Sequence, residues 1–180
     1  MKRIALFVLG VMVVSTGALA QAPDPAVETP LLAAPANLRE AATVIKWKAD
    51  FTYDTLRKGT NRLVCYDRSG QPTQQAFSLE CTSIANINRV AQNMKFEAMG
   101  DKRQAMLDAA EKDGTRVKPE FGSIFYNLGG PDKDHARPHM TVAVPMATAQ
   151  SLGLPDTNKE GGAWIMNAGT STAHIMIPGH

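Results

Sequence analysis

The side chains best suited to chemistry are gathered in the last third of the chain. Asp134, His135 and His139 lie within a few residues of one another, and His174 follows in a later segment. Imidazole and carboxylate groups are common ligands of zinc, copper and related divalent metals. If the strands that carry His139 and His174 are neighbours, the two imidazoles share the less apolar face of one sheet. With His135 or Asp134, they would then approach a divalent transition metal.

A simpler interpretation leaves these histidines on the surface without a ligand. Residues 129–138 are rich in Gly, Pro and Asp, a composition typical of a solvated turn. The chain has four histidines, an ordinary number, and the last is the terminal His180. Sequence alone does not establish which strands are adjacent. We therefore favour the solvated turn and keep a metal site at His135, His139 and His174 as the alternative.

The sequence predicts no catalytic residue and no cofactor-binding residue. It contains no Gly-x-Ser-x-Gly elbow, no His-Glu-x-x-His, no Cys-x-x-Cys-His, no Walker loop and no EF-hand loop. Asp134 and His135 offer an acid and a base, but adjacent side chains rarely face each other and no nucleophile is indicated. A non-catalytic role is favoured.

The two cysteines, Cys65 and Cys81, lie in two strand-like runs separated by a turn at 69–72. In an oxidising compartment an isolated pair is expected to be bonded. Their spacing is much wider than the Cys-x-x-Cys of redox-active pairs. We predict a structural disulfide that contributes about 3 kcal/mol by closing the intervening loop.

Strands and helices that would position these residues follow from the hydrophobic pattern. Apolar and polar residues alternate from Ile45 to Tyr53, which predicts a strand. The stripe from Ile84 to Ala98 has helical spacing, and a second helix is expected from Asp101 until Gly114. Further strands are predicted over 62–67, 77–82, 121–128, 138–144, 163–167 and 172–177, with a short helix over 147–152.

The order of these elements predicts the fold class. Strands come first, then helices, then strands again, without regular β-α-β alternation. This order favours an α+β domain in which an antiparallel sheet packs against one helical layer.

The first twenty residues have the features of a cleavable secretory signal. Lys2 and Arg3 precede an apolar stretch, and a small-x-small site ends at Ala20. The stretch is too short for a stable membrane anchor, which needs about 20 apolar residues. We expect cleavage after Ala20 and a periplasmic or secreted protein without a membrane span.

Removal of the signal changes the charge of the chain. The full sequence has 19 basic and 17 acidic residues, and Lys2 and Arg3 belong to the basic set, so the mature chain has 17 of each. A balanced surface exerts no long-range attraction on polyanions, so we expect no nucleic-acid partner. The partners left open are a periplasmic protein and a small ligand.

Residues 21–42 are rich in Pro and Ala, a composition that favours extended, solvated chain. We therefore predict a flexible leader over 21–42 and one domain over 43–180.

Two segments resemble exported bacterial proteins of unknown function. They run from Arg57 to Asp67, with the sequence RKGTNRLVCYD, and from Asn167 to His174, with the sequence NAGTSTAH. The resemblance covers most of the mature domain. It implies export and a bacterial source, and it transfers no activity, substrate or catalytic residue.

Three hypotheses for function follow. The first is an exported accessory module that binds a ligand or partner, which we favour because it requires no catalytic motif. The second is a small metal-binding protein that uses His135, His139 and His174. The third is a hydrolytic enzyme of unrecognised type.

Overall fold

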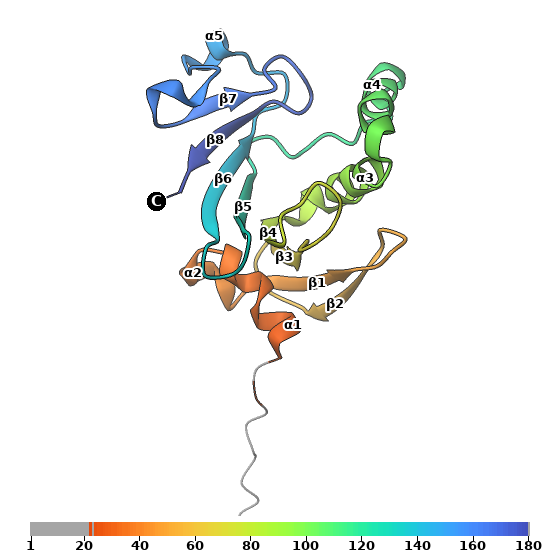
Figure 1. The fold of residues 1–180 in the computed structure, drawn as a ribbon, viewed down its shortest axis with the longest axis vertical. Coiled ribbons are helices and arrows are strands. Elements are labelled where there is room, and N and C mark those ends of the chain that lie inside the picture. Colours follow the sequence, from red (N-terminus) through yellow and green to blue (C-terminus); the bar gives the residue numbers. More distant parts are fainter. Residues whose placement is uncertain (1–21, 23, 180) are drawn as a thin grey trace, which may run out of the picture.

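The computed structural model describes residue 22 and residues 24–179 (Figure 1). The signal predicted over residues 1–20, its cleavage site and His180 lie outside the described residues.

An eight-stranded sheet forms the centre of the molecule, in the order β2-β1-β3-β4-β5-β6-β8-β7. Neighbouring strands are antiparallel except β1 and β3, which are parallel. The sheet is therefore mixed, and the predicted α+β class is confirmed. The strands are β1 (Thr43–Trp47), β2 (Tyr53–Arg57), β3 (Leu63–Asp67), β4 (Phe77–Ser83), β5 (Ile124–Gly130), β6 (Arg137–Ala143), β7 (Trp164–Met166) and β8 (His174–Pro178).

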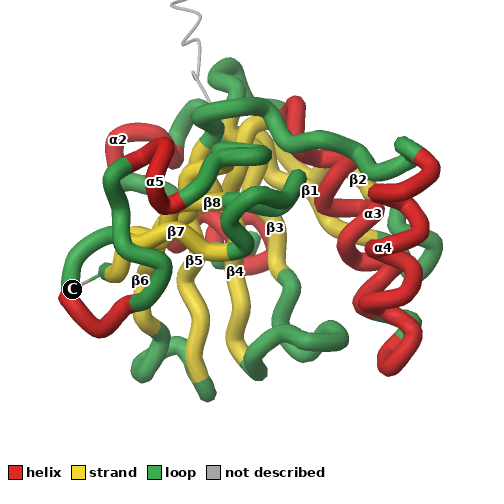
Figure 2. Tube along the Cα trace, turned by 90° about the horizontal axis from the view of Figure 1, so that it is seen from above, coloured by secondary structure: helices red, strands yellow, loops and turns green. Residues whose placement is uncertain are grey.

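The helical segments lie around this sheet, with the two longest together at one end of it. Figure 2 shows α3 and α4 together beside β1 and β2, and α5 beside β7 and β8. They are α1 (Pro25–Glu28), η1 (Pro30–Ala33), α2 (Ala36–Arg39), η2 (Ile84–Asn86), α3 (Ile87–Glu97), η3 (Gly100–Lys102), α4 (Arg103–Asp113), α5 (Ala149–Leu152) and η4 (Asn158–Glu160). As predicted, α4 ends at Gly114, whose φ of 74° is the left-handed conformation that glycine adopts readily.

The strand predicted from Ile45 to Tyr53 is a hairpin, formed by β1 and β2. Its turn is stabilised by Asp50, whose carboxylate accepts hydrogen bonds from the backbone N–H and the hydroxyl of Thr52, at 3.0 and 2.6 Å. The alternation of apolar and polar residues continues through this turn, so it does not reveal the break.

The two faces of the sheet are covered by different parts of the chain. On the helix face, Ile45, Trp47, Val64 and Tyr66 pack against α3. On the opposite face, which we call the disulfide face, the N-terminal segment packs over the centre of the sheet. Its core contains Leu31, Ala34, Ala42, Val44, Leu63, Cys65 and Cys81. Burial of apolar surface on both faces stabilises the domain.

The prediction of a flexible leader over 21–42 is wrong for the residues from Pro25 onward. They form α1, η1 and α2, and Leu31 exposes only 3% of its surface. Prolines occupy the first turn of α1 and of η1, where a missing N–H removes no helical hydrogen bond. Pro25 and Pro30 therefore begin helices here, and the folded unit starts before residue 43.

The predicted disulfide between Cys65 and Cys81 is present. The two residues are directly opposite each other on β3 and β4, with Cα atoms 4.0 Å apart. Both are fully buried beneath the N-terminal segment. The bond therefore joins two neighbouring inner strands under the core of the disulfide face.

In residues 22 and 24–179, no helix has both the length and the apolar character needed to cross a membrane.

Candidate functional site

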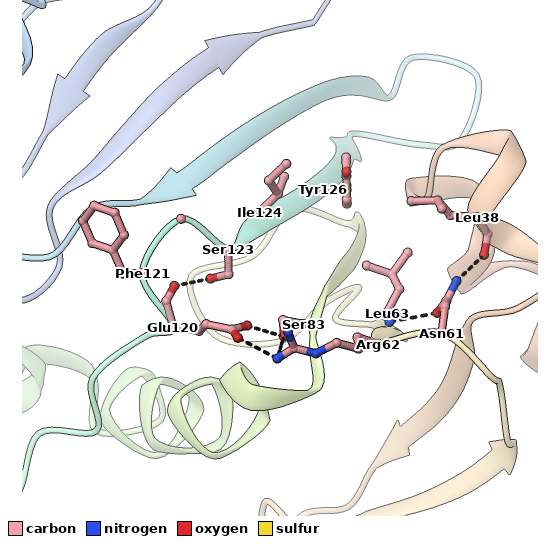
Figure 3. Close-up of a pocket in the computed structure, with 11 residues that line it drawn as sticks. Leu38, Asn61, Arg62, Leu63, Ser83, Glu120, Phe121, Ser123, Ile124 and Tyr126 are labelled. Atoms are coloured by element: carbon pink, nitrogen blue, oxygen red, sulfur yellow. Dashed lines mark hydrogen bonds and ion pairs between the residues drawn. The ribbon is translucent and has the colours of Figure 1, made fainter.

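A hollow of about 430 Å³ opens on the disulfide face (Figure 3). It lies between α2, the start of β3, the end of β4 and the loop that leads into β5. The residues around it are Leu38, Asn61, Arg62, Leu63, Ser83, Glu120, Phe121, Gly122, Ser123, Ile124 and Tyr126.

The walls of this hollow are largely apolar. Ile124 and Tyr126 are two residues apart on β5, so both point to the disulfide face, and Leu63 on β3 points the same way. Leu38 of α2 closes one side. Phe121 stands at the rim with 72% of its surface exposed. An exposed aromatic ring beside an apolar hollow is typical of a surface that buries another group.

One edge of the hollow carries an ion pair. Nη2 of Arg62 lies 2.6 Å from Oε1 of Glu120, and the hydroxyl of Ser83 donates to Oε2 of Glu120 at 2.6 Å. The hydrogen bond from Ser83, followed by that from Arg62, lowers the pKa of Glu120. Glu120 is therefore a carboxylate at neutral pH, and both its oxygens already have partners.

The loop that carries Glu120 is held in place by Asn86, a buried residue of η2. Its side-chain oxygen accepts from the backbone N–H of Glu120 at 2.8 Å, and its amide donates to Ser123 at 2.8 Å and to Thr82 at 2.9 Å. Arg89 of α3 holds the same loop through a hydrogen bond to the backbone oxygen of Val117. The hollow thus has a preformed wall.

Arg62 is a charged residue with unused hydrogen-bonding capacity at this site. Its side chain is 69% exposed, and among the described residues only Nη2 has partners, which leaves Nε and Nη1 for another group. Asn61 is occupied on both sides, since its amide donates to Leu38 and its oxygen accepts from the backbone of Leu63. A ligand that enters the hollow therefore meets guanidinium donors.

Sequence reasoning missed this site. Arg62 and Glu120 are 58 positions apart, and neither lies in a local motif. Only the aromatic Phe121, directly after the charged Glu120, could have drawn attention to the loop.

The predicted metal-site residues lie in two places. His135 and Asp134 belong to the exposed turn between β5 and β6. Nδ1 of His135 lies 2.8 Å from the carboxylate of Asp132, a hydrogen bond that is the main cause of the lowered pKa of Asp132. The backbone N–H of Asp134 donates to the same carboxylate at 3.0 Å. These contacts stabilise a turn.

His139 and His174 do lie on neighbouring strands and share the helix face of the sheet. However, His139 pairs with Pro178 and His174 pairs with Ala143, so the two are four positions apart in register. This offset is about 13 Å along the strands. Burial, and then the nearby His174, lower the pKa of His139. Within the described part of the chain, no three His, Cys, Asp or Glu side chains are grouped to hold a metal ion.

His139 instead ends a row of polar side chains across four strands of the helix face. Tyr66, Glu80, Asn127 and His139 are direct cross-strand partners in turn. The hydroxyl of Tyr66 donates to the carboxylate of Glu80. Burial raises the pKa of Glu80. The row depends on strand register, which the sequence did not reveal.

No protein-family model, no curated protein and no solved structure matches this chain. An account of function therefore rests on the geometry of its own residues.

Proposed function

We propose that the protein is an exported, non-catalytic binding protein that holds a small amphipathic carboxylate in the hollow on the disulfide face. The observation that carries this proposal is the pairing of apolar walls with the free guanidinium donors of Arg62. An alkyl or aryl group would lie against Leu63, Ile124 and Tyr126. Its carboxylate would accept a hydrogen bond from Nε or Nη1 of Arg62.

The state of Glu120 supports an anionic ligand over a cationic one. Each of its carboxylate oxygens already accepts a hydrogen bond, and Arg62 compensates its charge, so an ammonium group would gain less attraction there than at a free carboxylate. A carboxylate, by contrast, adds to a donor that is unused, and a hydrogen bond between a guanidinium N–H and a carboxylate is strengthened by the two charges. Phe121 would cover part of the bound apolar group.

Export is the second part of the proposal. The signal predicted over residues 1–20 and the resemblance to exported bacterial proteins support a periplasmic or secreted location. A disulfide between Cys65 and Cys81 is consistent with an oxidising compartment.

Titration calorimetry with a series of straight-chain carboxylates, all below their micellar concentrations, tests the ligand. Each added methylene that enters the hollow should strengthen binding about fourfold, because its burial contributes about 0.8 kcal/mol. This gain should stop once the hollow is full. Alkylamines of the same lengths serve as controls for the head group.

The head group is tested with Arg62→Gln. The matched control is Arg137→Gln, which removes an exposed arginine of β6 that does not line the hollow. Arg62→Gln should weaken octanoate binding roughly tenfold, the size expected for a charge-assisted hydrogen bond. Equal affinities for the two variants, or equal binding of octylamine and octanoate, would contradict the proposal.

A further inference from the structure

A second hollow, of about 240 Å³, lies on the other side of the sheet. It is enclosed by the β1–β2 turn, the β3–β4 loop and the C-terminal end of α3. Trp47, Phe51 and Met94 form its apolar side, and Arg68, Gln71 and Glu97 form its polar side. None of these residues lines the hollow that carries Arg62.

The polar side is built from a buried ion pair. Nη2 of Arg68 bonds to Oε2 of Glu97, and Nε of Arg68 donates to Gln71 at 3.1 Å. Nη1 of Arg68 and Oε1 of Glu97 have no partner among the described residues, yet neither belongs to the fully enclosed atoms without partners. Both atoms therefore reach accessible space, and the hollow is the space that both residues line. The pair offers one donor and one acceptor.

Trp47 adds a second unsatisfied donor. The residue exposes only 9% of its surface, and its indole N–H is fully enclosed without an acceptor in the described part of the chain. Because this nitrogen has almost no accessible surface, a ligand in the hollow does not reach it directly, but the residue lines the hollow and its N–H signal reports on that wall. The ring is held in position by edge-to-face contacts with Tyr53 and Tyr66, at 5.5 and 5.6 Å between centroids.

The turn that completes the wall has an unusual backbone. Phe51 has a φ of 65°, the left-handed conformation that residues with a side chain rarely adopt. Its N–H donates to the backbone oxygen of Lys48 at 3.0 Å. Such conformations are concentrated at ligand sites, where they place a side chain that an ordinary turn would direct elsewhere.

We infer that this second hollow binds a neutral planar amide, such as an aromatic carboxamide or a ring amide. Its carbonyl oxygen accepts from Nη1 of Arg68, and its N–H donates to Oε1 of Glu97. Its ring lies against Trp47 and Met94. Arg68 and Glu97 neutralise each other, so the site favours a neutral ligand over a carboxylate.

The test uses the indole N–H as the reporter, in ¹⁵N-labelled mature protein. The chain has two tryptophans, so Trp164→Phe leaves the Trp47 indole signal alone in its spectral region. Benzamide should move this signal in a saturable manner. N,N-dimethylbenzamide, which lacks the N–H donors, and benzoate, which adds a charge, should each bind roughly tenfold more weakly or worse, because each leaves a buried polar group unpaired or brings in an unpaired charge.

Two variants locate the site without disturbing the buried ion pair. Ala98→Leu adds bulk at the exposed end of α3 on the wall of the hollow, and Ala105→Leu makes the same change on the exposed surface of α4. Benzamide binding should fall roughly tenfold in Ala98→Leu and stay unchanged in Ala105→Leu. Equal binding by the two variants, a Trp47 signal that does not move, or equal affinities for benzamide and its dimethyl derivative would overturn the inference.

Discussion

Leu31→Ala measures how strongly the N-terminal segment is bound to the sheet. Leu31 is almost fully buried against Ala34, Val44 and the disulfide. Its truncation removes apolar atoms from this core and leaves a cavity that the β-strands below cannot readily fill. Substitutions of this kind cost 2–5 kcal/mol, and we expect about 3 kcal/mol of unfolding free energy here.

Leu56→Ala is the matched control. Leu56 lies on the edge strand β2 and exposes 38% of its surface, so the same chemical change there should cost less than about 1 kcal/mol. Both variants are made in the mature chain and unfolded with urea. With a slope of about 2 kcal/mol per molar, the loss at Leu31 corresponds to a midpoint about 1.5 M lower. Indistinguishable midpoints for Leu31→Ala and Leu56→Ala would refute the packing of residues 25–42 on the sheet.

Three further predictions concern the disulfide, the signal and a buried carboxyl group. Replacement of Cys65 and Cys81 by Ser should lower the unfolding free energy by about 3 kcal/mol while octanoate still binds; equal melting temperatures with and without reductant would reject a structural bond. Intact-mass analysis of exported protein should give a chain that begins at Gln21, and recovery in the membrane fraction of a chain that still carries residues 1–20 would reject the cleavable signal. The pKa of Glu80 is raised from 4.5, so the stability that this group contributes is fully present below pH 4.5 and is lost as the pH rises through its folded pKa. Glu80→Gln keeps an acceptor for Tyr66 but does not titrate, so urea unfolding at several pH values should show this loss of stability in the unsubstituted protein and not in the variant. Parallel pH profiles for the two proteins would contradict this prediction.

Local patterns in the sequence predicted the centre of the sheet well. The strands β3 and β4, the turn between them and the bond between Cys65 and Cys81 follow from alternation, turn residues and cysteine count, all of which act over short distances. The end of α4 at Gly114 is also a local property of the backbone.

The sequence-based predictions that were wrong or incomplete have a common physical cause, because tertiary contacts override local composition. The Pro and Ala content of residues 21–42 indicates solvated chain. It does not reveal that Leu31 is buried against the disulfide face of the sheet, whose strands come later in the sequence. The turn around Asp50 preserves the alternation that defines a strand. Arg62 and Glu120 meet through contacts between distant segments, among them the hydrogen bond that joins Asn86 of η2 to the loop before β5.

The positions of the histidines also depend on tertiary contacts that local patterns do not reveal. Their strand faces follow from alternation, and β6 and β8 are indeed neighbours. The offset between His139 and His174 is decided by strand register, which depends on turns and pairing across the whole sheet.

A crystal structure of the mature chain with octanoate, grown below the micellar concentration of the ligand, tests the central claim most directly. We expect the carboxylate within hydrogen-bonding distance of Nε or Nη1 of Arg62, and the alkyl chain against Leu63, Ile124 and Tyr126, with the pairing of Glu120 and Ser83 intact. An empty hollow at saturating octanoate, or a ligand bound elsewhere on the molecule, would contradict it.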